Sequence, residues 1–195
     1  ANDGATVTNL QLRNATVLGN DRVGALSGKC TNCIVNGVDI RGGTITANGS
    51  YAGGAFGSIE GTHTISNVYA SASVTNNGGS SLYTGGLAGA VLSAGTLTQC
   101  YASGMVTSAG DEVGGLFGAL KFADSTFSFA LGNVAGGEAV GGFAGSIGDG
   151  STVTRSFARG QVAGTNAVGG FVGRSGTTSG AVFYSFATGS VSSNG

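Results

Sequence analysis

The stretch Val140–Val162, VGGFAGSIGDGSTVTRSFARGQV, contains two short motifs that recur along the chain. The first, Val140-Gly-Gly-Phe-Ala-Gly145, has six copies, which begin at residues 23, 52, 84, 113, 140 and 168. The second, Ser156-Phe-Ala-Arg-Gly-Gln-Val162, has copies that end at residues 17, 45, 74, 106, 134, 162 and 191. Neighbouring copies of each motif lie 27 to 32 residues apart. Because two separate motifs keep one period, the sequence predicts a repeat protein.

The composition favours an ordered, close-packed chain over a disordered one. Gly accounts for 40 of 195 residues and Pro is absent, yet 41% of the residues are hydrophobic and the net charge is −1. Disordered segments combine low hydrophobicity with high net charge. A near-neutral chain with scattered basic residues also argues against nucleic acid as a partner. No apolar run approaches the roughly 20 residues that a membrane helix needs, so we expect no membrane insertion.

Residue types within the repeat indicate strands. Val, Ile, Thr, Phe and Tyr are enriched, and the frequent Gly residues would each cost a helix about 1 kcal/mol. Apolar and polar residues alternate in Ala158–Val162, the pattern of a half-buried strand. We therefore predict one domain over residues 1–195, a parallel β-solenoid of about seven coils of roughly 28 residues. Each coil would contain three short strands between Gly-rich corners, wound in the right-handed sense that parallel crossovers favour.

Stacked coils place equivalent residues in columns about 4.8 Å apart. Three such columns are predicted to form the core, and the Gly residues to supply corners with φ > 0 and room in a narrow lumen. The aromatic column holds Tyr69, Tyr101, Phe129, Phe157 and Phe186, continued by Leu12 and Ile40. The second holds Leu26, Ala55, Leu87, Leu116, Phe143 and Phe171, and the third holds Val17, Ile45, Val74, Val106, Val134, Val162 and Val191.

The paired motifs resemble a known family. Val113-Gly-Gly-Leu-Phe-Gly118, followed by Ser128-Phe-Ala-Leu-Gly-Asn-Val134, is similar to the GLUG motif of bacterial surface proteins, which occurs in adhesins and in non-catalytic regions of secreted IgA-cleaving metallopeptidases. The resemblance covers the regular coils of residues 84–195 well and the degenerate coils of residues 1–83 weakly. It implies an extracellular scaffold at the bacterial cell surface and no chemistry.

The cysteines and acids raise the questions of a zinc site, of a disulfide or free thiols, and of a calcium site. Cys30-Thr-Asn-Cys33 has the spacing of a zinc knuckle, a local disulfide or two free thiols, but zinc needs four ligands and His63 is the one histidine. Cys100 takes the place of a repeated Ser and is expected to be a buried free thiol. A structural calcium ion would need recurring acids, and Asp111, Asp124 and Asp149 keep no repeat position. We expect no cofactor.

Catalysis is not favoured by the acids. Parallel β-helices include polysaccharide-degrading enzymes, which would need a pair of carboxylates on one face. The acids stand apart, except for Asp111-Glu112, which we interpret as solvated loop charges; a catalytic triad would have to use His63, and no nucleophile motif surrounds it. The single acids are Asp3, Asp21, Asp39, Glu60, Asp124, Glu138 and Asp149. The prediction is therefore a protein that is not an enzyme.

Binding surfaces remain as alternatives. Tyr51, Tyr83 and Tyr184 could stack on sugars or lie half-buried in a column. Ordered Thr ladders can bind ice, and no regular Thr-x-Thr column is evident in the linear sequence. Extra residues in the loops near 71–81 and 93–96 mark a face where solenoids often bind ligands.

The ends of the chain suggest assembly. The sequence begins at Ala1, as a processed product would, and no charged cap or amphipathic helix precedes the first coil or follows the last. Open coil ends are rows of unpaired backbone groups, and head-to-tail contacts between them build fibres. The hypothesis is a subunit or stalk segment of a surface filament or adhesin, with its own copies or the rest of a larger protein as partner, and possible glycan or host-surface ligands.

Overall fold

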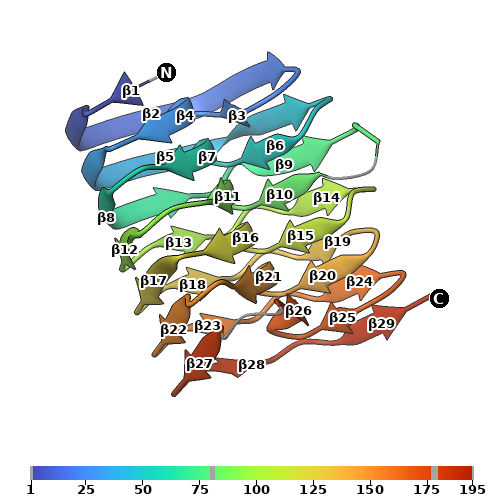
Figure 1. Cartoon of the computed structure of the whole chain (residues 1–195). Coiled ribbons are helices and arrows are strands. Elements are labelled where there is room, and N and C mark those ends of the chain that lie inside the picture. Colours follow the sequence, from blue (N-terminus) through green and yellow to red (C-terminus); the bar gives the residue numbers. More distant parts are fainter. Residues whose placement is uncertain (1, 80–81, 177–179, 195) are drawn as a thin grey trace.

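The computed structural model describes residues 2–79, 82–176 and 180–194, and these wind into a parallel β-solenoid of about six turns (Figure 1). The predicted fold class is confirmed: every strand pair is parallel, and the described residues contain no helix. The first coil lies at one end of the stack and the last coil at the other, so the described termini mark opposite ends of the molecule (Figure 1).

Three sheets run along the stack. Sheet A has seven strands: β1 (Asn2–Asp3), β4 (Ser27–Thr31), β7 (Phe56–Glu60), β11 (Ala88–Val91), β16 (Phe117–Lys121), β21 (Ala144–Gly148) and β26 (Val172–Ser175). Sheet C has six strands: β3 (Val23–Gly24), β6 (Tyr51–Gly53), β10 (Tyr83–Gly85), β15 (Glu112–Gly114), β20 (Ala139–Gly141) and β25 (Val168–Gly169).

Sheet B has 16 strands and is bent; with sheets A and C it gives each coil the three predicted strand faces, and in the later coils its face is broken into shorter strands. The first coils cross it as β2 (Thr6–Gly19), β5 (Ile34–Ala47), and β8 (His63–Ala70) with β9 (Ser73–Asn76). Later coils cross it in three pieces: β12 (Gly95–Thr98), β13 (Tyr101–Ala102), β14 (Val106–Ser108); β17 (Ala123–Thr126), β18 (Phe129–Ala130), β19 (Val134–Ala135); β22 (Thr152–Thr154), β23 (Phe157–Ala158), β24 (Val162–Gly164); and β27 (Ala181–Phe183), β28 (Phe186–Ala187), β29 (Val191–Ser193). A regular coil such as β20–β24 therefore has five short strands.

Two predicted columns are confirmed. The Val and Ile column is in register throughout: Val17 pairs with Ile45, Ile45 with Val74, and so on through Val106, Val134, Val162 and Val191. The Leu and Phe column is joined by backbone hydrogen bonds, in which each N–H donates to the carbonyl of the next coil, from Leu26 through Ala55, Leu87, Leu116 and Phe143 to Phe171. Leu87, Leu116 and Phe143 are fully buried.

The aromatic column stacks as predicted but lies outside the core. Tyr69, Tyr101, Phe129, Phe157 and Phe186 pair in register. Their rings are half-buried or exposed, whereas the Ala that follows each is buried in all but the last coil. Asp39 and Gln11 continue the column, while Ile40 and Leu12 continue the Ala column. Strand alternation gives the lumen to the small residue because the narrow coil has no room for rings on this side.

One column of glycines is required because the backbones of neighbouring coils approach each other closely, and not because of positive φ. A Cβ on Gly132 would overlap the backbone carbonyl of Gly104 in the preceding coil, and Gly160 stands in the same relation to Gly132. None of these three glycines has a positive φ. Gly is therefore required at these positions by the approach of stacked backbones, whereas the sequence predicted lumen space and positive φ as the reasons.

One corner of sheet B carries the positive φ instead. Register places Asn9, Gly37, Asn67, Gln99, Phe127, Arg155 and Tyr184 in one column, and all seven have φ between 49° and 69°. Asn and Gly tolerate this conformation, but a larger side chain costs about 1–2 kcal/mol in it. In the last four coils Gln99, Phe127, Arg155 and Tyr184 adopt this conformation despite that cost. No sequence motif predicted it.

The Gly column yields a stability prediction. Gly132→Ala should lower the midpoint of urea unfolding and cost about 1–3 kcal/mol, because the methyl group would force two packed coils apart. Gly79→Ala is the matched control, since a Cβ there meets nothing within 4 Å, and it should change stability by less than about 0.5 kcal/mol. Equal effects of the two substitutions would contradict the close-approach explanation.

Candidate functional site

The two end coils expose the same columns that the middle coils bury. At the first coil, Val7, Leu10, Leu12 and Val17 point toward the lumen and are only partly buried. Strand β2 pairs with β5 on one edge, and its other edge has no partner strand among the described residues. Unpaired edge strands of this length are the usual template for association with another chain.

The last coil is open in the same way. Val182 and Val191 are 43% and 47% exposed, although Val153 and Val162, their equivalents one coil earlier, are buried. Phe171 and Val172 pack against the core on one side only. The register therefore matches an apolar residue on one end with an apolar residue on the other: Val182 is in the column of Val7, and Val191 is in the column of Val17.

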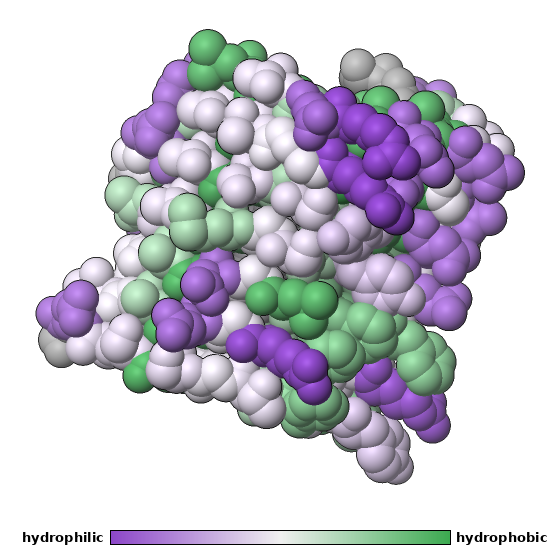
Figure 2. All heavy atoms as spheres, turned by 180° about the vertical axis from the view of Figure 1, so that it is seen from behind, coloured by the Kyte–Doolittle hydropathy of each residue, from purple (hydrophilic) through white to green (hydrophobic). Residues whose placement is uncertain are grey.

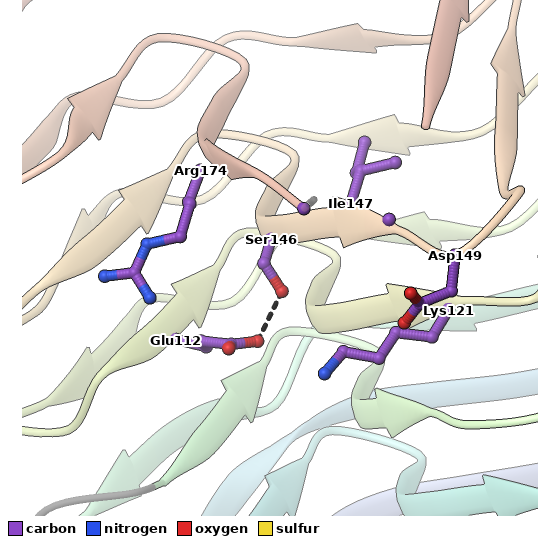
Figure 3. Close-up of a pocket in the computed structure, with 8 residues that line it drawn as sticks. Glu112, Lys121, Ser146, Ile147, Asp149 and Arg174 are labelled. Atoms are coloured by element: carbon purple, nitrogen blue, oxygen red, sulfur yellow. Dashed lines mark hydrogen bonds between the residues drawn. The ribbon is translucent and has the colours of Figure 1, made fainter. Parts of the chain in front are cut away.

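A polar cleft of about 220 Å³ lies on the outer side of sheets A and C near the C-terminal coils (Figure 3). Its charged walls come from Glu112 on β15, Lys121 on β16, Asp149 in a turn and Arg174 on β26. The Ser146 hydroxyl donates a hydrogen bond to the Glu112 carboxylate (Figure 3). Sequence analysis named Glu112 only within the Asp111-Glu112 pair and Asp149 only as a single acid, and winding of the chain brings both to one cleft with Lys121 and Arg174.

Three charged groups of this cleft have partners in its wall or just outside it. Arg174 donates to the Glu138 carboxylate at 2.8 Å, and the Lys121 ammonium lies 5.7 Å from the centre of the Tyr83 ring. Glu112 and Asp149 line the same cleft, the kind of acid pair that a glycosidase would need. The lining contains no histidine, and the Glu112 carboxylate already accepts a hydrogen bond from Ser146.

His63 lies away from this cleft, on β8 in sheet B. It is 2% exposed, its Nδ1 is 2.9 Å from the Gly61 carbonyl oxygen, and its Nε2 has no hydrogen-bond partner in the structure. Burial lowers the pKa of this imidazole, so the ring is neutral at neutral pH. A buried neutral ring with no hydroxyl or carboxylate bonded to it offers no support for a catalytic triad.

The remaining single acids are spread over separate coils and faces. Glu60 joins Arg22 and Lys29 in an ion cluster on the N-terminal coils, with its carboxylate 2.7 Å from the Lys29 ammonium. Lys29 is the main reason that the pKa of Glu60 is lowered. Asp39 pairs with Arg41, Asp21 with Arg22, and Asp3 accepts from Asn32. No three potential ligands gather closely enough for a metal ion within residues 2–79, 82–176 and 180–194.

The cysteines take two of the predicted states. Cys30 and Cys33 form a disulfide within one turn of the chain, which leaves neither thiol for zinc. Cys100 is a buried free thiol in the column of Ser128, Ser156 and Ser185. Along this column each Ser Oγ accepts the backbone N–H of the residue one coil earlier, and the Cys100 N–H donates to Ser128 at 3.2 Å.

The tyrosines do not present free faces for sugars in the N-terminal half. Tyr51 and Tyr83 stack on each other at 5.2 Å, and Arg22 and Lys121 cover the two rings from outside. All ring faces in this stack are therefore engaged. Tyr184 is 84% exposed, and Arg155 lies over its ring.

Thr side chains form columns that the linear sequence concealed. Thr6, Thr64, Thr96 and Thr152 occupy one outward column of sheet B, and Thr8, Thr98, Thr126 and Thr154 occupy the next, two residues further along each strand. Ile34, Asp124 and Ala181 occupy the other positions of the first column, and Asn36, Ser66 and Phe183 those of the second. A regular Thr-x-Thr column is therefore absent from the described strands, as expected: both positions are Thr only at 6/8, 96/98 and 152/154, and no two of these coils are neighbours.

Comparison with known proteins adds no identity. No family model, curated protein or solved structure matches this chain. A search of the described residues for an apolar helix long enough to cross a bilayer also found none.

The cysteine arrangement gives a thiol-counting prediction. Burial raises the pKa of Cys100 to about 12, so near pH 8 almost none of it is thiolate and a disulfide reagent should not react with the folded protein. We expect no reactive thiol in the native protein, one after unfolding in denaturant, and three after unfolding with reduction. Fast reaction of one thiol in the native state would show that Cys100 is accessible; three after denaturant alone would show that the disulfide is absent.

Proposed function

We propose that the chain is a non-enzymatic structural β-solenoid, a subunit or stalk segment of an extracellular bacterial fibre or adhesin that stacks head to tail with further copies of itself. The observation that carries the proposal is the match between the two open ends. Two columns, apolar in every coil except at Ser125, run the length of the stack and emerge at both ends in the same register, at Val7 and Val17 on one end and Val182 and Val191 on the other. Contact between unlike ends is heterologous and does not close, so it produces a filament.

Three further observations support a structural role. The outward edges of the end coils carry no Pro, which would block strand pairing, since the chain contains none. The disulfide suits an oxidising exterior. The resemblance to GLUG repeats points to the bacterial surface.

Charges placed on the two open ends test the stacking. Val7→Glu and Val182→Glu each put an unpaired carboxylate where a neighbouring coil would bury it, which should weaken association at least about a hundredfold. The unmodified chain should form filaments visible by electron microscopy and a concentration-dependent series in sedimentation velocity. Thr8→Glu is the matched control, because it adds the same charge on the same strand but faces outward.

Mixing the two variants sharpens this experiment. Each variant keeps one intact end, so a mixture should form one-to-one dimers and nothing longer. A chain that stays monomeric at high concentration, or assembly that both variants leave unchanged, contradicts the proposal.

A second candidate function is ice binding, and the two outward Thr columns favour it. The longest run is Thr98, Thr126 and Thr154, in which hydroxyl and methyl groups repeat at the inter-coil step of about 4.8 Å. Ordered water over this short run is the basis of the candidate. The protein should then shape growing ice crystals and lower their growth temperature, and Thr98→Tyr should abolish the effect while Thr107→Tyr, on a different part of sheet B, should not. Crystals that grow as in buffer alone would exclude this function.

A further inference from the structure

The corner of sheet B that carries positive φ becomes aromatic and basic in the last coils. Phe127, Arg155 and Tyr184 follow one another in its column, in a conformation that Asn or Gly would adopt with less strain. The earlier coils use Asn9, Gly37 and Asn67 there. Strain at successive equivalent positions, held by large side chains, points to a surface that has a use beyond the fold.

Arg155 lies between two rings. Its guanidinium carbon is 5.6 Å from the centre of the Phe127 ring and 5.6 Å from the centre of the Tyr184 ring. The N–H bonds of a guanidinium all lie in its plane, so contacts with its two faces leave the N–H edge available. The side chain is exposed and has no carboxylate within ion-pair distance in the described part of the chain.

Arg159 provides a second cation beside the first. It is exposed, its guanidinium carbon lies 5.5 Å from the centre of the Phe157 ring, and no ion pair to it is found among the described residues. The two arginines are four positions apart in the sequence, so their Cα atoms are at most about 14 Å apart. The pair therefore offers two oriented donors to one extended ligand.

The surface around the two arginines limits the class of ligand that could bind there. Figure 2 shows a group of strongly hydrophilic residues in the upper part of this side of the molecule, and hydrophobic residues interspersed with hydrophilic ones in the lower part. Leu131 and Phe127, on a neighbouring coil, are exposed apolar side chains. The rings of Phe129, Phe157 and Phe186 stack on one another at 4.1 Å and 5.3 Å, so no face between them is open to a nucleobase. Single-stranded nucleic acid would need such platforms.

We infer that Arg155 and Arg159 form a binding site for an anionic polysaccharide, whose carboxylate or sulfate groups accept hydrogen bonds from the two guanidinium edges. Planar and tetrahedral oxyanions match the guanidinium fork, and the aromatic rings hold Arg155 in place before the ligand arrives. A saturated sugar chain can lie across the apolar ring edges between the two cations without stacking. This site does not depend on end-to-end assembly.

Binding to defined polymers tests the site. The probes are heparin fragments as the sulfated chain, polygalacturonate as the carboxylated chain and dextran as the neutral chain, titrated at low salt by calorimetry. The unmodified protein should bind at least one anionic chain and not dextran. Arg155→Gln and Arg159→Gln should each reduce affinity about tenfold or more, and Arg155→Lys should reduce it less, because the charge remains but the fork is lost.

Two variants separate this site from general charge effects. Arg13→Gln removes an exposed arginine from the outer side of the first coil and should leave affinity unchanged. Phe127→Leu removes one wall of the sandwich without changing charge and should weaken binding. Equal loss in Arg13→Gln, binding of dextran as tight as that of the anionic chains, single-stranded DNA bound more tightly than either polysaccharide, or no binding at low salt would each overturn the inference. Measurement in the Val7→Glu background keeps a failure of binding distinct from a failure of assembly.

Discussion

Lateral hydrogen bonding between successive coils is the constraint on which the rest of the structure depends. Each coil donates its backbone N–H groups to the next at one fixed step, so every position along the chain must recur in register. The step forces small residues wherever two backbones or a backbone and the lumen meet, as at Gly104, Gly132 and Gly160. It also lines up whatever side chain a coil presents outward, which turns single residues into columns.

Columns make the outer surface change along the axis. The outward position beside the small lumen residues begins as Gln11 and Asp39, passes through Tyr69 and Tyr101, and ends as phenylalanines. Inside the coils the change along the axis is from apolar to polar. In the column that contains Ser128, the early coils have Val38 and Val68, and the later coils have Cys100 and Ser128, whose side chains bond backbone groups. One scaffold therefore carries different surfaces at its two ends, and the core contacts change with them.

The solenoid could be predicted because the spacing of the motifs and the alternation of apolar and polar residues are both visible in a single sequence. It placed the Val and Leu columns correctly, since each repeats with the motif. It misassigned the aromatic rings, because an apolar residue beside an Ala looks like core unless the width of the lumen is known. It could not find the Thr columns or the polar cleft, which join residues from several coils whose spacing varies. The column of positive φ could not be predicted either, because Phe127, Arg155 and Tyr184 are not the residue types that usually adopt positive φ.

The unequal sheets have a geometric consequence. Sheet A has seven strands and sheet C has six, because β1 precedes the first strand of sheet C. If β1 and β2 of one copy continue sheets A and B of the copy before it, the place between β25 of one and β3 of the other has no strand from the described residues. A filament built this way would have a notch on one side at every junction, one strand wide and bordered by two unpaired glycine-rich edges. Such a notch would give the filament a repeating, directional mark and a place where an extended peptide could be inserted.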